Sequence, residues 1–114
     1  MRQINVGNGS DSEARFVRDE ESAKLRHMLF LVIETFRDVQ AIGERFQSEG
    51  RMLPPDVVYH ASWIDEEKMR CFQIMEAPSE EALQPWMEKW KDLVEFEVVP
   101  VVNSSEFWSK LRSA

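Results

Sequence analysis

Residues 57–76 read VVYHASWIDEEKMRCFQIME, and this stretch decides the fold. Its two ends are rich in β-branched and aromatic residues, so they predict two strands joined by a tight turn at residues 65–68. An even-length loop then sets the register and predicts two polar cross-strand pairs, His60 with Gln73 and Ser62 with Cys71. Because side chains alternate along a strand, the other face of the hairpin is apolar and consists of Tyr59, Ala61, Trp63, Phe72 and Ile74.

Strands are also predicted near both ends of the remaining sequence. Residues 28–34, MLFLVIE, form a continuous apolar run of strand length, as expected for the middle strand of a sheet. Residues 94–102 alternate over their first half and contain Pro100, which has no N–H to donate to a neighbouring strand. The first segment is therefore expected at the centre of the sheet and the second at an edge.

Three helices are predicted by capping residues and helical spacing. Asp38 begins the first, which ends at Gly50, a residue suited to the left-handed conformation after a helix. Ser79 begins the second, which Pro85 divides into a short first turn and a second piece. Asn103 or Ser104 can begin the last helix, which carries three apolar residues on one side, Phe107, Trp108 and Leu111.

The order strand, helix, strand, strand, helix, strand is the split βαβ pattern of an α+β ferredoxin-like fold with an antiparallel sheet. Helices cover one sheet face in this fold. We expect the uncovered face to carry Met28, Phe30, Val32, Cys71 and Met75. Since such a face is too apolar to leave in water, the pattern predicts a homodimer that forms a dimeric α/β barrel.

Length and composition restrict the protein class. A chain of 114 residues is expected to form one domain at 28–114, preceded by a polar N-terminal extension at 1–27 with a short helix near the Ser10–Glu13 capping box. The net charge of -7 argues against a nucleic-acid partner, and no apolar run is long enough to cross a membrane. A single cysteine excludes an internal disulfide and fits a reducing compartment, so we expect a cytoplasmic protein.

Several segments together resemble a known family: MLFLVIE at 28–34, GRMLP at 50–54, the Ser62–Trp63 pair, CFQIME at 71–76, and WKDLVEFEVVPV at 90–101. Over residues 28 to about 111 the chain is similar to an uncharacterised family of small bacterial proteins within the dimeric α/β-barrel superfamily. That superfamily includes isomerase-like and monooxygenase-like proteins, some cofactor-independent and some heme-degrading, and members without catalysis. The resemblance implies dimerisation more than any reaction, and it transfers no catalytic residue.

The candidate site combines polar and apolar side chains expected in the barrel interior. Proton transfer would fall to His60 with Gln73 or Glu34, while the ligand would contact Phe30, Ser62, Cys71 and Met75. The simpler alternative is that His60 and Gln73 only hydrogen-bond each other across the hairpin.

Other residue combinations carry weaker signals. His60, Cys71 and an acidic residue have no close metal-ligand spacing, so no metal is predicted. The resemblance makes heme attachment through His27 or His60 conceivable, but a lone histidine is more often structural, so no cofactor is predicted. Glu95 and Glu97 alternate with apolar residues, so both carboxylates are expected on the face opposite the helices. Paired acids can perform acid–base catalysis, but salt bridges or solvation are the commoner role of such carboxylates. Three tryptophans, Trp63, Trp86 and Trp90, could form an aromatic wall for a flat ligand, but helical spacing makes core packing the commoner role of the last two. Three arginines, Arg45, Arg51 and Arg70, are dispersed among acidic residues and predict no phosphate site.

Three functions follow as hypotheses. The first is a homodimeric accessory protein that binds a small, largely apolar ligand. The second is a cofactor-independent enzyme of isomerase or monooxygenase type acting on a small apolar or aromatic substrate. The third is an interaction module whose interior is filled by its own side chains.

Overall fold

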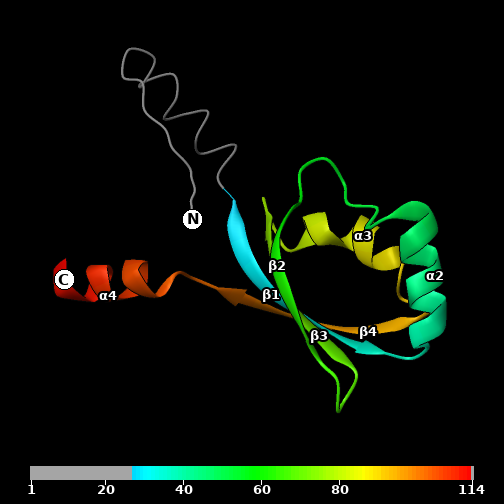
Figure 1. The fold of residues 1–114 in the computed structure, drawn as a ribbon. Coiled ribbons are helices and arrows are strands. Elements are labelled where there is room, and N and C mark those ends of the chain that lie inside the picture. The colour runs from blue at the N-terminus through cyan, green and yellow to red at the C-terminus, as the bar shows by residue number, and fades with distance from the viewer. Residues whose placement is uncertain (1–26, 114) are drawn as a thin grey trace.

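The computed structural model describes residues 27–113 and contains a four-stranded antiparallel sheet with order β2-β3-β1-β4 (Figure 1). The elements in chain order are β1 (Met28–Phe36), α2 (Val39–Glu49), β2 (Val58–Asp65), β3 (Arg70–Ala77), the 3-10 turn η1 (Glu81–Leu83), α3 (Gln84–Glu88), β4 (Val94–Val101) and α4 (Ser104–Ser113). The α+β class is confirmed, and the arrangement is compatible with a ferredoxin-like fold. As predicted, β1 is central and the strand with Pro100 lies at an edge. The predicted extension at 1–27 lies outside the described residues except for His27.

The predicted helix boundaries are confirmed by local hydrogen bonds. The Asp38 carboxylate accepts the Ala41 N–H at 3.0 Å at the start of α2. Gly50 follows the helix with φ 70° and donates its N–H to the Phe46 carbonyl at 2.8 Å. Pro85 stands in the first turn of α3, directly after η1, so this region is divided as its sequence predicts.

The hydrophobic core lies between the sheet and the η1–α3 segment. Its fully buried side chains come from the central strands and from this segment, and include Phe30, Val32, Met75, Leu83 and Trp86. The prediction that Phe30, Val32, Cys71 and Met75 line the uncovered face is therefore wrong, and Met28 is the exposed start of β1. Since β1 is apolar at consecutive positions, its alternation could not reveal which set faces the helices.

The β2–β3 hairpin contains a bulge that the sequence did not predict. Ser62 lies opposite Gln73, but the register shifts between Tyr59 and Ala61, so that Tyr59 lies opposite Met75. The expected pairs His60–Gln73 and Ser62–Cys71 are both wrong, because the ladder begins at Asp65–Arg70 and is shifted by two residues from the predicted register. His60 is in addition the extra residue of the bulge. The bulge turns Tyr59 toward the helices and moves His60 to the open face of the sheet, where its Nε2 lies 2.6 Å from Glu76 Oε1.

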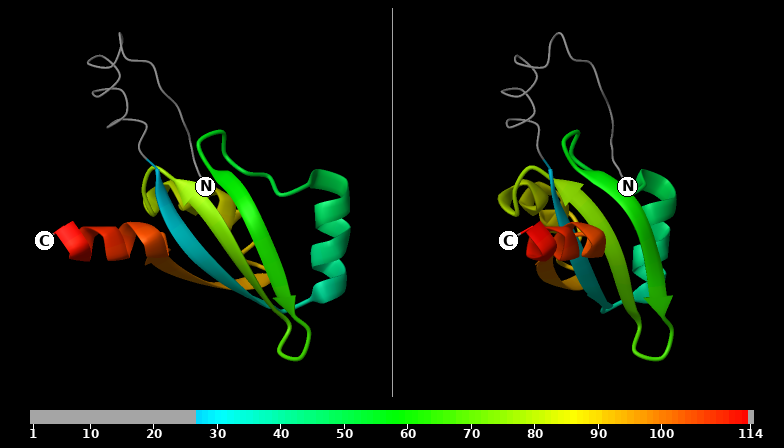
Figure 2. Two further views of the ribbon diagram at one scale, coloured as in Figure 1. Left: turned by 60° about the vertical axis from the view of Figure 1, so that its left-hand side comes forward. Right: turned by 90° about the vertical axis from the view of Figure 1, so that its left-hand side faces the viewer.

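The C-terminal helix α4 stands apart from the core. It continues beyond the end of β4 and lies away from α2 and α3 (Figures 1 and 2). Its apolar residues Phe107, Trp108 and Leu111 are 45%, 54% and 54% exposed. Among the described residues no helix is long and apolar enough to cross a membrane.

Candidate functional site

A polar cluster lies on the helix-covered face of the sheet, built by three adjacent strands. Glu34 on β1 is opposite Cys71 on β3, and Gln73 on β3 is opposite Ser62 on β2. Gln73 is 3% exposed, and its side-chain amide donates a hydrogen bond to the Glu34 carboxylate. A buried amide therefore holds the carboxyl group in place at the border of the apolar core.

Two hydroxyl groups extend the cluster toward the edge of the sheet. The Tyr59 and Ser62 hydroxyl oxygens are 2.7 Å apart, and Ser62 also hydrogen-bonds the Cys71 thiol. The bulge makes this contact possible, because it brings Tyr59 to the same face as Ser62. The cluster thus offers several groups that can both donate and accept hydrogen bonds.

Burial gives Glu34 the electrostatic properties of a proton-exchanging group. It raises the pKa of the Glu34 carboxyl from 4.5 to about 7, although the Gln73 hydrogen bond and the positive charge of Arg51 act in the opposite direction. Burial, helped by the charge of Glu34, also raises the pKa of the Cys71 thiol to about 11. At neutral pH Glu34 populates both protonation states, while Cys71 stays a neutral thiol and a poor nucleophile.

Arg51 enters the site from the segment between α2 and β2. Its guanidinium carbon lies 3.6 Å from the centre of the Tyr59 ring and 5.3 Å from that of Phe46. The Trp90 indole N–H donates to the Arg51 carbonyl at 3.1 Å and fixes the backbone at this point. A cation is thereby placed beside the cluster by two aromatic rings and one backbone contact.

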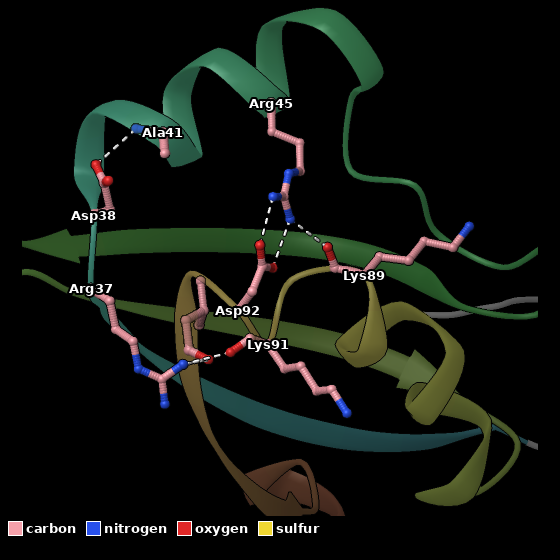
Figure 3. Close-up of polar contacts among 8 residues, drawn as sticks. Arg37, Asp38, Ala41, Arg45, Lys89, Lys91 and Asp92 are labelled. Carbon is pink, nitrogen blue, oxygen red and sulfur yellow. Dashed lines mark hydrogen bonds and ion pairs between the residues drawn. The ribbon is translucent and has the colours of Figure 1, made fainter.

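Polar bonds tie α2 to the segment that follows α3 (Figure 3). Arg45 makes two hydrogen bonds with Asp92, of 2.9 and 2.8 Å, and a third with the Lys89 carbonyl at 2.7 Å. No residue of α2 is buried, and Phe46 remains 44% exposed. The helix thus combines an ion pair with the partly buried Ile42, which packs against the core. The cluster residues Glu34, Tyr59 and Ser62 and the neighbouring Arg51 are half-buried.

Comparison with known proteins identifies the family. One family model, described as a domain of unknown function (DUF3303), matches residues 28–114. The chain belongs to the DUF3303 family. No curated protein and no solved structure matches it. The expectation of an uncharacterised family is confirmed, whereas the place of the DUF3303 domain in the dimeric α/β-barrel superfamily stays a prediction.

The DUF3303 domain brings most of the predicted site residues to one face. Glu34, Gln73, Ser62 and Cys71 form the cluster, and Phe30 and Met75 lie in the adjoining core. His60 is the exception, because the bulge places it on the opposite face. The hydrogen-bond partner of the Gln73 side chain is therefore Glu34 and not His60.

The other sequence candidates lie outside the cluster. His27 Nδ1 and His60 Nε2 contact the two oxygens of Glu76, at 3.2 and 2.6 Å. In the described part of the chain, no group of three or more His, Cys, Asp or Glu residues is placed to hold a metal ion. Glu95 and Glu97 pair with Thr35 and Ile33 on β1 and lie on the face opposite the helices, as predicted. Two of the tryptophans, Trp86 and Trp90, pack in the core, whereas Trp63 is 61% exposed.

Two site residues, Arg51 and Tyr59, were not predicted from the sequence. Unbroken alternation assigned Tyr59 to the apolar face, and nothing in the sequence around His60 signals a bulge. For Arg51 a signal existed, because Gly50 at the end of a helix forces a change of chain direction before β2. That turn is what brings the Arg51 side chain back over the sheet.

Proposed function

We propose that this DUF3303 domain binds a small, largely apolar molecule with one polar group at the Glu34 cluster. The observation that carries the proposal is the half-buried Glu34 carboxyl, which accepts a hydrogen bond from buried Gln73 on the helix-covered face of the sheet. A few convergent polar groups beside an apolar surface are typical of small-molecule sites.

The apolar part of the ligand has a suitable surface next to Glu34. Phe96 on β4 pairs with Glu34 across the sheet, and the ring centres of Trp86 and Phe96 are 5.3 Å apart in an edge-to-face contact. These rings lie opposite the hydroxyl side of the cluster, so the surroundings change from polar to apolar across β1. A ligand with one polar end fits this gradient.

A thermal-shift screen of a small-molecule library against the full-length protein tests the binding function. We expect ligands that raise the Tm, and we expect Glu34→Leu to weaken their binding by about five- to 100-fold because a buried hydrogen-bond partner is lost. Glu97→Leu, an equal change on the open face, is the control and leaves binding unchanged. A library without any stabilising ligand, or equal binding to both variants, would contradict the proposal.

A cofactor-independent enzyme of isomerase or monooxygenase type is the second candidate, and the pKa of Glu34 near neutrality favours it. In this proposal Glu34 takes the place of His60 as the proton-transferring residue, because His60 lies on the opposite face of the sheet. If a ligand from the screen is turned over, Glu34→Gln should reduce the rate by roughly a hundredfold or more, while His60→Ala should leave it unchanged. The opposite result would restore His60 as the catalytic residue.

We also propose that the open sheet face associates with a second copy of the chain as a dimeric α/β barrel. On this face five apolar side chains of β1 and β3 are only partly buried: Leu29, Leu31, Ile33, Phe72 and Ile74. Trp63 extends the surface on β2 and is 61% exposed. The exposed apolar side of α4, which projects beyond the sheet, supplies a second surface that a partner can cover.

Light scattering of the full-length protein tests the homodimer. We expect the mass of two chains for the wild type, and the mass of one chain for Trp63→Glu because it places a charge within an apolar interface. Val39→Glu is the control, since Val39 is 46% exposed but belongs to α2 on the other side of the sheet. A monomeric wild type would remove the barrel from the proposal and leave the Glu34 site untouched.

A further inference from the structure

We infer that Arg51 is the anchor for an acidic group of the ligand, so that the Glu34 site selects small organic carboxylates. The inference rests on the proposed function and specifies its ligand class. Three other arginines, Arg37, Arg45 and Arg70, donate hydrogen bonds from their guanidinium groups to oxygen atoms of the protein. Among the described residues, no oxygen atom accepts a hydrogen bond from the Arg51 guanidinium, whose contacts are with aromatic rings.

The surroundings of Arg51 leave its hydrogen-bonding edge available. Tyr59 and Phe46 contact the guanidinium as ring partners, and such contacts use the flat faces of the group. The N–H donors point outward in the guanidinium plane, where a carboxylate can accept two of them. Arg51 is half-buried. In the proposed complex the ligand reaches these donors from solvent, and the two rings exclude part of the competing water.

The backbone near Arg51 is shaped to hold this position. Gly50 and Met52, on either side, both have positive φ angles, of 70° and 61°. A positive φ is uncommon for a residue with a side chain, and such conformations concentrate at binding sites. The Trp90 indole bond to the Arg51 carbonyl secures the same segment from the core side. The chain therefore adopts an uncommon conformation at Met52, next to a cation that has no ion-pair partner among the described residues.

Charge explains why the preferred ligand is an anion. The chain carries a net charge of -7, so an anion needs a local cation in order to bind. Arg51 is close enough to Glu34 to oppose the rise of its pKa, yet no carboxylate of the described residues forms an ion pair with Arg51. A ligand carboxylate supplies the missing partner, and its negative charge favours the protonated form of the neighbouring Glu34, which can then donate a hydrogen bond.

Benzoate and benzamide are suitable probes because they have the same ring and similar shape but differ in charge. Their dissociation constants for the full-length protein can be measured by ligand-observed NMR titration. We expect benzoate to bind at least about tenfold more tightly than benzamide, and Arg51→Gln to abolish this preference. Arg51→Lys, which keeps the charge but loses the planar fork, should retain part of the preference and confirm that the site still forms.

Arg112→Gln is the matched control, since it removes an exposed cation on α4, away from the site (Figure 1). It should leave the preference for benzoate unchanged. If both probes bind equally to the wild type, or if the preference survives Arg51→Gln, the Arg51 anchor is refuted while ligand binding at Glu34 stands. If neither probe binds, the selection of carboxylates is refuted, and the library screen decides the binding function independently.

Discussion

Trp86→Ala should lower the free energy of unfolding by about 3–5 kcal/mol, the cost typical of truncating a large buried aromatic residue. Trp86 is 2% exposed and is the largest fully buried side chain among the described residues; it packs from α3 against Phe96 of the sheet. Because α3 has five residues, and Trp86 is the one that is buried, the helix has no other anchor of this size. Urea denaturation followed by circular dichroism measures the loss.

Trp86→Phe is the informative companion variant. The indole N–H of Trp86 is buried and has no hydrogen-bond partner among the described residues, so phenylalanine removes an unsatisfied donor while it keeps an aromatic ring against Phe96. We expect a loss of about 1 kcal/mol or less, because the gain from removing the donor offsets part of the lost packing. A loss below about 1 kcal/mol for Trp86→Ala would mean that α3 does not pack on the sheet as described.

The elements of the fold were predictable because each has a local signal. Asp38 and Gly50 mark the ends of α2, Pro85 divides the second helical region, and Pro100 indicates an edge strand. The covered face was not predictable, because β1 has apolar residues on both faces. Leu31 and Val32 look equivalent in sequence, and only the packing of η1 and α3 makes Val32 the buried one.

The site was predicted in composition but not in geometry. Glu34, Gln73, Ser62 and Cys71 were all candidates, and strand alternation alone brings them to one face. The exchange of Tyr59 and His60 depends on one extra residue in the strand ladder, which arises from the pairing of β2 with β3 and leaves no local signal. One extra residue reverses which sheet face the preceding β2 side chains point to. The bulge therefore moves His60, the expected base, out of the site and brings the Tyr59 hydroxyl into it.

The stability of the domain should fall as the pH rises from about 4.5 to about 7, and Glu34 is the cause. Its pKa is about 7 in the folded protein against an ordinary value of 4.5, so in this range the folded state holds a proton that the unfolded state has lost. Rising pH therefore favours the unfolded state. At about 1.4 kcal/mol for each pH unit between these values, and allowing for partial solvent screening, the loss is on the order of 2 kcal/mol.

Glu34→Gln isolates this contribution, because glutamine has the same shape and no titration. Urea denaturation at pH 5 and at pH 8 should give a smaller difference for Glu34→Gln than for the wild type, with the variant the more stable of the two at pH 8. Glu97→Gln, the same substitution at an exposed position of β4, should reproduce the wild-type difference. A wild-type stability that is level or rising between pH 5 and pH 8, together with no effect of Glu34→Gln, would mean that the Glu34 carboxyl is solvated like an ordinary surface acid. The proton exchange assigned to this site would then have no physical basis, since it depends on the same burial.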